Sequence, residues 1–277
     1  MWEIGFAAVL EDLHVAQLMY DATAAAGYER GFARISSHFI PFLLSAAGVS
    51  VGHRVLDVAT GTGLAAEAAL ALVGPTGHVT ATDISPQMAV RARERLKAAP
   101  NATIQIEDGQ ALGLPDGSFD AVICSLGLMF FPDPARGLSQ FRRVLRNGGR
   151  AAVSVNTVPE RSYSTRVHPI IARYVPSLAA DAARLFALGN EQKLGALLAA
   201  AGFRDVKITT EKHCLGVGSF YEYFEHVERG WGSPGQAFVS LPPDTQRAVR
   251  EDVRHDVGDT GGPIQIEVEV MFGSGRK

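Results

Sequence analysis

The stretch Val55-Leu56-Asp57-Val58-Ala59-Thr60-Gly61-Thr62-Gly63 decides the fold of this 277-residue chain. An apolar strand runs into a glycine loop, and the loop opens a predicted helix from Leu64 to Val73. A second apolar run, His78 to Thr82, then ends on Asp83. In α/β proteins this order places a ligand-binding loop at the carboxyl ends of parallel strands. The glycines let the backbone approach a ligand, and a carboxylate after the second strand can accept hydrogen bonds from ribose hydroxyls.

Two kinds of ligand fit this loop. Residues 61–66, Gly-Thr-Gly-Leu-Ala-Ala, match the dinucleotide fingerprint G-x-G-x-x-G/A, which is a weak signal alone. Asp57 argues against a dinucleotide, because a pyrophosphate on a helix N-terminus gains from positive potential and a nearby carboxylate opposes it. S-adenosylmethionine has no phosphate, and its ammonium suits a carboxylate. Asp57 also has a simpler reading as a cap of the helix that follows the loop.

Two further predicted strands favour the adenosyl ligand. A third strand begins at Ile104 and ends in Asp108, where a carboxylate can accept a hydrogen bond from the exocyclic amine of an adenine. A fourth strand, Ser118 to Ser125, follows a Pro-Asp-Gly turn. Carboxylates at positions 57, 83 and 108, each closing a predicted strand, fit S-adenosylmethionine better than a dinucleotide.

Residues 50–155 resemble the class I S-adenosylmethionine-dependent methyltransferases, within the group that contains the ubiquinone/menaquinone-biosynthesis methyltransferases. The matching segments are VLDVATGTG, VTATDIS, ALGLPDGSFDAVICSLGLMFFPDP and RVLRNGGRAAVSV, in that order. Ala59 stands where many members have the first glycine of the loop. The resemblance implies an α/β fold, a doubly wound and mostly parallel seven-stranded sheet of the Rossmann-like methyltransferase type. Its last strand is antiparallel, which suits the period-two alternation of Ile264 to Met271.

The resemblance also implies a set of cofactor contacts. Asp57 would lie near the ammonium, Asp83 on the ribose and Asp108 near the adenine amine. Ser125 would lie beside the sulfonium, and Tyr20 would reach the cofactor carboxylate. The residues expected to bind S-adenosylmethionine are Tyr20, Asp57, Ala59, Gly61, Gly63, Asp83, Ile84, Met88, Asp108, Gly109 and Ser125.

Several of these residues have structural alternatives. Asp83 can cap the helix that starts at Pro86, a role compatible with ribose binding. Ile84 and Met88, expected on the adenine, are equally typical of a hydrophobic core. Tyr20 is equally typical of a helix-packing tyrosine.

Composition limits the function classes. The chain is 47% hydrophobic with a formal net charge of −3, and it has no Lys/Arg run of the kind nucleic-acid binding requires. The cluster Arg91, Arg93, Arg95 and Lys97 is predicted to be a solvated helix face. Cys124 and Cys214 are predicted to be buried strand thiols, and no metal-ligand spacing occurs. With no signal peptide and no apolar run of ~18 residues, we expect a soluble, cytoplasmic protein.

The expected organisation has four parts. Residues 1–48 form an N-terminal helical cap, with helices from Phe6 to Met19 and from Tyr28 to Ala47, the latter interrupted at Pro41. Residues 49–156 form the cofactor-binding core, in which a helix from residue 134 ends at the cap signal Asn147-Gly148-Gly149. Residues 157–190 are a helical lid insertion. Residues 191–277 complete the sheet and carry a second helical insertion, 219–257.

The acceptor of the methyl group is a separate question. His168 and His226, one in each insertion, are the candidate general bases, since histidine titrates near neutral pH. A packing histidine is the alternative for each. Aromatic residues assigned to the two insertions and the N-terminal helices favour a small, neutral, rather flat metabolite, unless they form the core of the lid. These aromatic residues are Phe130, Phe131, Tyr163, Tyr174, Phe186, Phe220, Tyr221, Tyr223, Phe224 and Trp231.

Three functions remain open at this level. The first is methyl transfer to an oxygen or carbon atom of a small metabolite. The second is a non-methylating cyclisation or rearrangement in an S-adenosylmethionine-binding enzyme. The third is an NAD-dependent oxidoreductase, which leaves Asp57 and the last strand unexplained. A homo-oligomer is compatible with the sequence but cannot be read from it.

Overall fold

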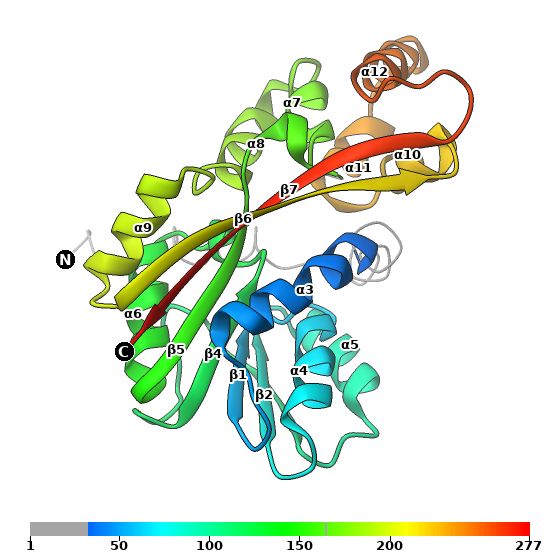
Figure 1. Cartoon of the computed structure of the whole chain (residues 1–277). Helices are drawn as coiled ribbons and strands as arrows, with labels where there is room; N and C mark the ends of the chain where they lie inside the picture. The colour runs from blue at the N-terminus through cyan, green and yellow to red at the C-terminus, as the bar shows by residue number, and fades with distance from the viewer. Residues whose placement is uncertain (1–32, 164) are drawn as a thin grey trace, which may run out of the picture.

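A single sheet in the strand order β3-β2-β1-β4-β5-β7-β6 organises the chain (Figure 1). The computed structural model describes residues 33–163 and 165–277. Within that part of the chain the strands are β1 Arg54–Val58, β2 His78–Asp83, β3 Ala102–Ile106, β4 Phe119–Ser125, β5 Leu145–Asn156, β6 Arg204–Val217 and β7 Ile264–Arg276. The pairs among β1 to β5 are parallel, and β7 is antiparallel to both β5 and β6. The predicted mostly parallel seven-stranded sheet with an antiparallel last strand is confirmed.

Helices cover both faces of the sheet. Successive strand residues point to opposite faces, and apolar side chains on each face are buried under a helix layer. On one face Val55 packs with α3 and α4, and on the other Leu56 packs with α6 and α9. The helices of these layers are α3 Ala33–Ala47, α4 Leu64–Val73, α5 Pro86–Leu96, α6 Pro134–Val144 and α9 Glu191–Ala200. A three-residue 3-10 helix, η1 Leu128–Phe130, follows β4.

The two insertions gather at one end of the sheet (Figure 1). The first contains η2 Pro159–Arg161, α7 Val167–Ala172, η3 Pro176–Leu178 and α8 Ala179–Leu185. The second contains α10 Phe220–Glu228, α11 Gly232–Val239 and α12 Pro243–Asp256, of which α11 was not predicted. We call these helices together the lid. The four-part division of the chain stays a prediction, and the expected helix from Phe6 to Met19 lies outside the described residues.

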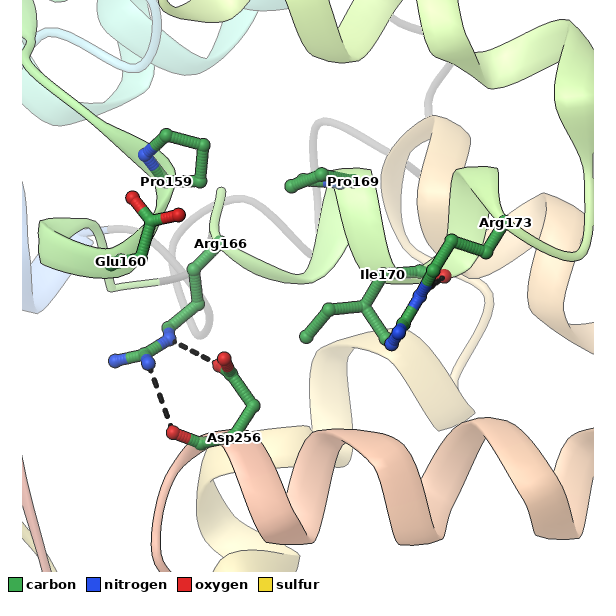
Figure 2. Close-up of a pocket in the computed structure, with 7 residues that line it drawn as sticks. All are labelled: Pro159, Glu160, Arg166, Pro169, Ile170, Arg173 and Asp256. Carbon is green, nitrogen blue, oxygen red and sulfur yellow. Dashed lines mark hydrogen bonds and ion pairs between the residues drawn. The ribbon is translucent and has the colours of Figure 1, made fainter.

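Polar contacts join the two insertions into one body. The Arg166 guanidinium donates from Nε to Asp256 Oδ2 at 2.7 Å and from Nη2 to the Asp256 carbonyl at 3.0 Å (Figure 2). Arg173 and the Tyr174 hydroxyl both reach the carboxylate of Asp252, at 2.9 and 2.8 Å. Each of these contacts links the α7 segment to α12, so neither insertion packs alone.

Three local expectations were wrong. Pro41 lies inside α3 and does not interrupt it. A proline inside a helix costs about 3 kcal/mol, and burying Leu43 and Leu44 against the sheet offsets that cost at about 1.5–3 kcal/mol per side chain. The segment Asn147-Gly148-Gly149 is not a helix cap but part of β5, where the Gly149 carbonyl accepts from the Lys277 N–H at 2.9 Å. The third strand ends at Ile106, two residues before Asp108.

We expect Asp256→Ala to lower the free energy of unfolding by about 2 kcal/mol, because it leaves the Arg166 guanidinium, only 10% exposed, without its carboxylate. The expected loss is below that of a fully buried pair because Asp256 is itself one-third exposed. Denaturant titration measures it. Asp244→Ala, which removes an exposed pair with Arg247 on the same helix, is the control and should cost less than about 0.5 kcal/mol. Equal losses of unfolding free energy in both variants would contradict a stabilising contact between Arg166 and Asp256.

Candidate functional site

The loop between β1 and α4 turns sharply through three left-handed residues. Ala59 has φ of 54°, Gly61 of 57° and Gly63 of 88°. The Thr60 N–H donates to the Thr82 carbonyl at 2.9 Å and so ties the loop to the end of β2. Left-handed backbone is accessible to glycine without penalty but costs an alanine about 1–2 kcal/mol. The glycine that many family members carry at position 59 therefore has a conformational reason.

Two buried carboxylates hold the loop from the ends of neighbouring strands. Asp83, the last residue of β2, accepts from the Gly61 N–H at 2.8 Å and from the Ser85 N–H at 2.9 Å. Asp57, within β1, accepts from the Thr60 hydroxyl at 2.6 Å. Both predicted carboxylates thus meet at the glycine loop, although the contacts to a ligand that were expected of them stay predictions.

The electrostatics of Asp57 are unusual for a carboxyl group. Burial raises its pKa to about 7; the Asp83 charge also raises it, while the Thr60 hydroxyl and the Ala66 N–H lower it. Its Oδ1 atom is buried and has no hydrogen-bond partner among the described residues. Burial likewise raises the pKa of Asp83, against the opposing effect of the Ser85 and Gly61 N–H groups. A site with two desolvated carboxyl groups favours a cation over an anion.

The remaining predicted cofactor residues lie around this loop at varied depth. Met88 is almost completely buried on α5, whereas Ile84 is partly exposed. Asp108 follows β3, and its Oδ1 accepts from the backbone N–H of Gln110 at 2.8 Å. Gly109 is buried against the Phe131 ring. Their roles toward a cofactor stay predictions, and Tyr20 lies outside the described residues.

Arg95 was expected to be part of a solvated helix face, and this was wrong. Its Nε donates to the Thr62 carbonyl at 2.8 Å, and its Nη1 lies 3.0 Å from the Glu67 carboxylate. Arg95 therefore holds the glycine loop from α5. The spacing of charges along that helix could not reveal a contact with a loop more than 30 residues earlier.

The loop after β4 lies directly beside the glycine loop. A side chain at Gly127 would meet the Ala59 Cβ at 2.7 Å, so the two loops touch. Ser125, the predicted neighbour of the sulfonium, ends β4 and is paired with Ser154 of β5. Leu126 then adopts a left-handed φ of 51° and donates its N–H to the Ser154 hydroxyl at 3.0 Å and carbonyl at 3.2 Å. No sequence signal indicated this strained leucine.

The candidate bases His168 and His226 are buried inside the lid. Each ring Nδ1 lies near a carbonyl oxygen three residues earlier, Thr165 at 3.1 Å and Tyr223 at 2.9 Å. The pKa of His168 is lowered to about 4, mainly by burial and also by the charge of His226, against the opposing effect of the hydrogen bond to Thr165. A base of that pKa takes up a proton weakly at neutral pH. Their catalytic role stays a prediction.

Many of the aromatic residues of the insertions form the core of the lid. Phe220 stacks on Phe224 at 5.2 Å, and Phe224 meets Phe238 edge-on at 5.3 Å. The Tyr223 hydroxyl donates to the Tyr163 carbonyl at 2.7 Å. The structural alternative therefore holds for these residues. Phe130, Phe131, Tyr174, Phe186 and Trp231 remain partly exposed.

A pocket of about 240 Å³ lies between η2, α7 and α12 (Figure 2). Its lining consists of Pro159, Glu160, Arg166, Pro169, Ile170, Arg173 and Asp256. Charges of both signs face this space, and none of the predicted cofactor or catalytic residues lines it. We therefore assign it no part in the cofactor site.

The remaining sequence expectations concern the two cysteines, metal ligands and membrane-spanning helices. Cys124 is buried as predicted, but Cys214 is exposed, because β6 is an edge strand whose side chains face solvent on alternate positions. No cluster of three or more metal-ligating side chains occurs in the part of the chain that the structure describes. None of the described helices combines the length and apolar character that crossing a membrane requires.

Comparison with known proteins identifies the family. A methyltransferase-domain family model matches residues 56–153. The ubiquinone/menaquinone biosynthesis C-methyltransferase of Saccharophagus degradans is 31% identical over 182 residues, which are 60% of this chain and 73% of that protein. Its counterpart in Geobacter sulfurreducens is 34% identical over 62% of this chain and 72% of its own length. The chain belongs to the S-adenosylmethionine-dependent methyltransferases.

Three further comparisons are with an uncharacterized relative and with two solved structures of low sequence identity. An uncharacterized protein of Mycobacterium tuberculosis is 36% identical over 65% of this chain, and the chain spans 63% of the length of that relative. The structure of a methyltransferase from Aquifex aeolicus is 20% identical, covers 68% of this chain and 90% of its own, and has a TM-score of 0.54. The [4+2]-cyclase SpnF is 18% identical over 87% of this chain and 81% of its own, with a TM-score of 0.54, so an enzyme named as a cyclase shares the fold.

Membership of the methyltransferases confirms the resemblance stated from the sequence. It also confirms the cofactor, since S-adenosylmethionine is the methyl donor that defines the family. The individual contacts of each site residue remain predictions, because no relative assigns them for this chain.

We expect Ala59→Gly to raise the free energy of unfolding by about 0.5–1 kcal/mol, because glycine relieves the left-handed strain at φ 54° but adds unfolded-state entropy. Ala68→Gly, in the interior of α4, is the matched control and should lower it by about 1 kcal/mol. Urea unfolding of the three proteins compares them. A loss of stability in Ala59→Gly comparable to that in the control would show that no strain is stored there.

A second prediction concerns pH. The folded pKa of Asp57 is about 7, above the unfolded value of about 4, so the folded state holds one more proton between those values. The stability that this proton contributes is complete below about pH 4 and is lost as the pH rises towards 7. We expect Asp57→Asn to flatten the fall in unfolding free energy of the ligand-free protein between pH 5 and 7. Identical pH slopes in wild type and variant would contradict the raised pKa.

Proposed function

We propose that this chain transfers a methyl group from S-adenosylmethionine to an oxygen or carbon atom of a small, largely apolar or aromatic metabolite. One observation carries the proposal: a glycine loop is held between the buried carboxylates of Asp57 and Asp83 at the carboxyl ends of β1 and β2. Such a loop accommodates an ammonium and opposes a pyrophosphate, which favours this cofactor over a dinucleotide.

The residues of the loop fit the cofactor. A side chain at Gly61 would meet no atom within 4 Å, so the backbone there borders open space. The buried Oδ1 of Asp57 makes no hydrogen bond with any described residue and is available to a cationic group, and Asp83 retains acceptor capacity for ribose hydroxyls. When bound, S-adenosylmethionine supplies a methyl group made electrophilic by the sulfonium.

The task of the protein is then mainly placement. Holding two reactants in line can lower a barrier by ~7–11 kcal/mol. In our proposal the glycine loop and Asp83 fix the donor, and the loop after β4 borders the reacting atoms. The lid excludes water and selects the acceptor. Transfer to a hydroxyl oxygen or an enol carbon also releases one proton from the acceptor. His168 and His226 stay the proposed groups to accept it, although burial lowers the pKa of His168 and so weakens it as a base.

Two considerations support a small apolar or aromatic acceptor. Relatives at 31 to 34% identity are C-methyltransferases of ubiquinone/menaquinone biosynthesis, which favours a carbon atom. The partly exposed aromatic residues of the lid and of the loop after β4 supply apolar surface for a flat ligand. The net charge of −3 disfavours a nucleic-acid partner. We also propose that the reaction takes place in the cytoplasm.

The experiment that tests the cofactor is calorimetric titration with S-adenosylmethionine, S-adenosylhomocysteine and NADH. We expect both adenosyl ligands to bind, and Asp83→Ala to weaken them by about 10–100-fold, since hydrogen bonds to charged groups are worth about 1.5–3 kcal/mol. Asp116→Ala, at an exposed turn, should bind as wild type does.

Binding of NADH alone would restore the dinucleotide reading and reject the proposal. Once an acceptor is found, product mass separates methyl transfer from a cyclisation or rearrangement, because only methyl transfer adds the mass of a methylene group. An unchanged mass would reject methyl transfer while leaving cofactor binding intact.

A further inference from the structure

We propose that Asn156 and Thr157, at the carboxyl end of β5, bind the polar group of the methyl acceptor and position its reacting atom. This inference rests on the proposed function and adds the acceptor side of the same site. It assigns two positioning residues that neither the sequence motifs nor the family comparison indicated.

Asn156 and Thr157 lie on the side of the sheet away from the expected ribose and adenine sites. Asp83 ends β2 and Asp108 follows β3, whereas Asn156 ends β5 and Thr157 follows it, on the opposite side of β1 and β4. Because Ser125 pairs with Ser154, residues 156 and 157 extend beyond the end of β4 in the direction of the loops. Two strand spacings, about 10 Å, separate β5 from β1. An acceptor placed there faces a donor held on β1 and β2.

A chain of contacts connects this position to the glycine loop. Gly127 lies against Ala59, and the neighbouring Leu126 is held in its left-handed conformation by the Ser154 hydroxyl. The Asn156 side chain reaches Met129, in η1 just after that loop. Non-glycine residues with positive φ cluster at ligand sites, where surrounding contacts maintain the strain. The strained Leu126 therefore lies between the proposed donor and acceptor positions.

The polar groups at this strand end are buried but poorly satisfied. Thr157 is 4% exposed, and its hydroxyl has no hydrogen-bond partner among the described residues. Asn156 is 8% exposed, and within the described part of the chain its Nδ2 makes two long contacts of 3.5 Å, to Met129 Sδ and to the Leu185 carbonyl. Buried polar groups in native proteins are normally paired, because leaving them unpaired costs stability. A ligand that pairs with them accounts for their retention.

The lid closes directly over the same strand end. Leu185, whose carbonyl faces Asn156, is the last residue of α8. Gly189, just after α8, approaches so closely that a side chain there would collide with the carbonyl oxygens of Asn156 and Thr157. Figure 1 shows the lid helices grouped beyond this end of the sheet. The first insertion thus shields residues 156 and 157 from water, as an acceptor subsite requires.

The chemistry of the two side chains indicates the class of acceptor group. A carboxamide offers a donor and an acceptor, and a hydroxyl offers both in one atom. Both side chains are neutral, so they suit a neutral hydroxyl or carbonyl, such as that of a phenol or enol, better than a carboxylate or phosphate. Such a group adjacent to the methylated carbon, or itself methylated, meets the proposed reaction.

The test uses the isosteric variant Thr157→Val, with Thr157→Ser as the rescue and 2-naphthol as the probe. We expect Thr157→Val to unfold at the same or a higher temperature, because it removes an unpaired buried hydroxyl. It should bind S-adenosylhomocysteine within about twofold of wild type. In the presence of S-adenosylhomocysteine it should bind 2-naphthol about tenfold more weakly, and Thr157→Ser should restore most of that affinity.

Naphthalene, which lacks the hydroxyl, is the matched ligand and should bind both proteins equally. Asn156→Leu should repeat the pattern of Thr157→Val. In turnover of the same probe, both variants should raise the KM for the acceptor and leave the KM for S-adenosylmethionine unchanged.

Several outcomes overturn the inference. A lower unfolding temperature in Thr157→Val means that the hydroxyl has a structural partner. Equal loss of naphthalene and 2-naphthol means that the variant alters shape and not hydrogen bonding. Wild type that binds S-adenosylhomocysteine but not 2-naphthol rejects the proposed acceptor group. Failure to bind S-adenosylhomocysteine at all rejects the proposed function on which the inference stands.

Discussion

The Asp83 carboxylate is the interaction on which the cofactor half of the structure depends. Its two oxygen atoms accept from the N–H groups of Gly61 and Ser85, so it joins the glycine loop after β1 to the start of α5. Arg95 on that helix returns to the loop through the Thr62 carbonyl. The loop is therefore fixed from two directions by side chains of the next strand–helix unit. A loop that is held in one conformation before the ligand arrives lowers the entropy cost of binding.

The sheet separates the two halves of the proposed reaction. The strands that follow one another in the chain, β1 to β3, provide the glycine loop and the carboxyl groups at one side. On the other side β5 ends beneath α8 in polar groups that have no good partners among the residues the structure describes. The strained Leu126 and the small Gly127 lie between them. In this proposal different strands hold the donor and the acceptor. The residues that bind the acceptor can therefore change without altering those that bind the donor.

Much of the fold, and the meeting of Asp57 and Asp83 at the glycine loop, could be predicted from sequence, because the signals there are local. The apolar run before Gly61, the carboxylate at Asp83 and the alternation of Ile264 to Met271 each report on their own element. The wrong predictions concern residues whose conformation or contacts depend on residues far away in the sequence. Gly149 pairs with Lys277, Arg95 binds the loop before it, and Pro41 stays helical because α3 packs on the sheet. Thr157 carries no motif, and its proposed role follows from the burial of a hydroxyl that has no hydrogen-bond partner in the described part of the chain.

The position of β7 between β5 and β6 has a consequence for synthesis of the chain. Strands β1 to β5 and their helices can assemble in the order in which they leave the ribosome. Strand β6 emerges before β7, and β7 is the strand with which it pairs in the described sheet. At about 5–20 residues per second, the second insertion keeps β6 waiting for several seconds. The edge of β5 on which β7 pairs waits as well, so the proposed acceptor side can be completed only after the strands of the proposed cofactor side have been synthesised.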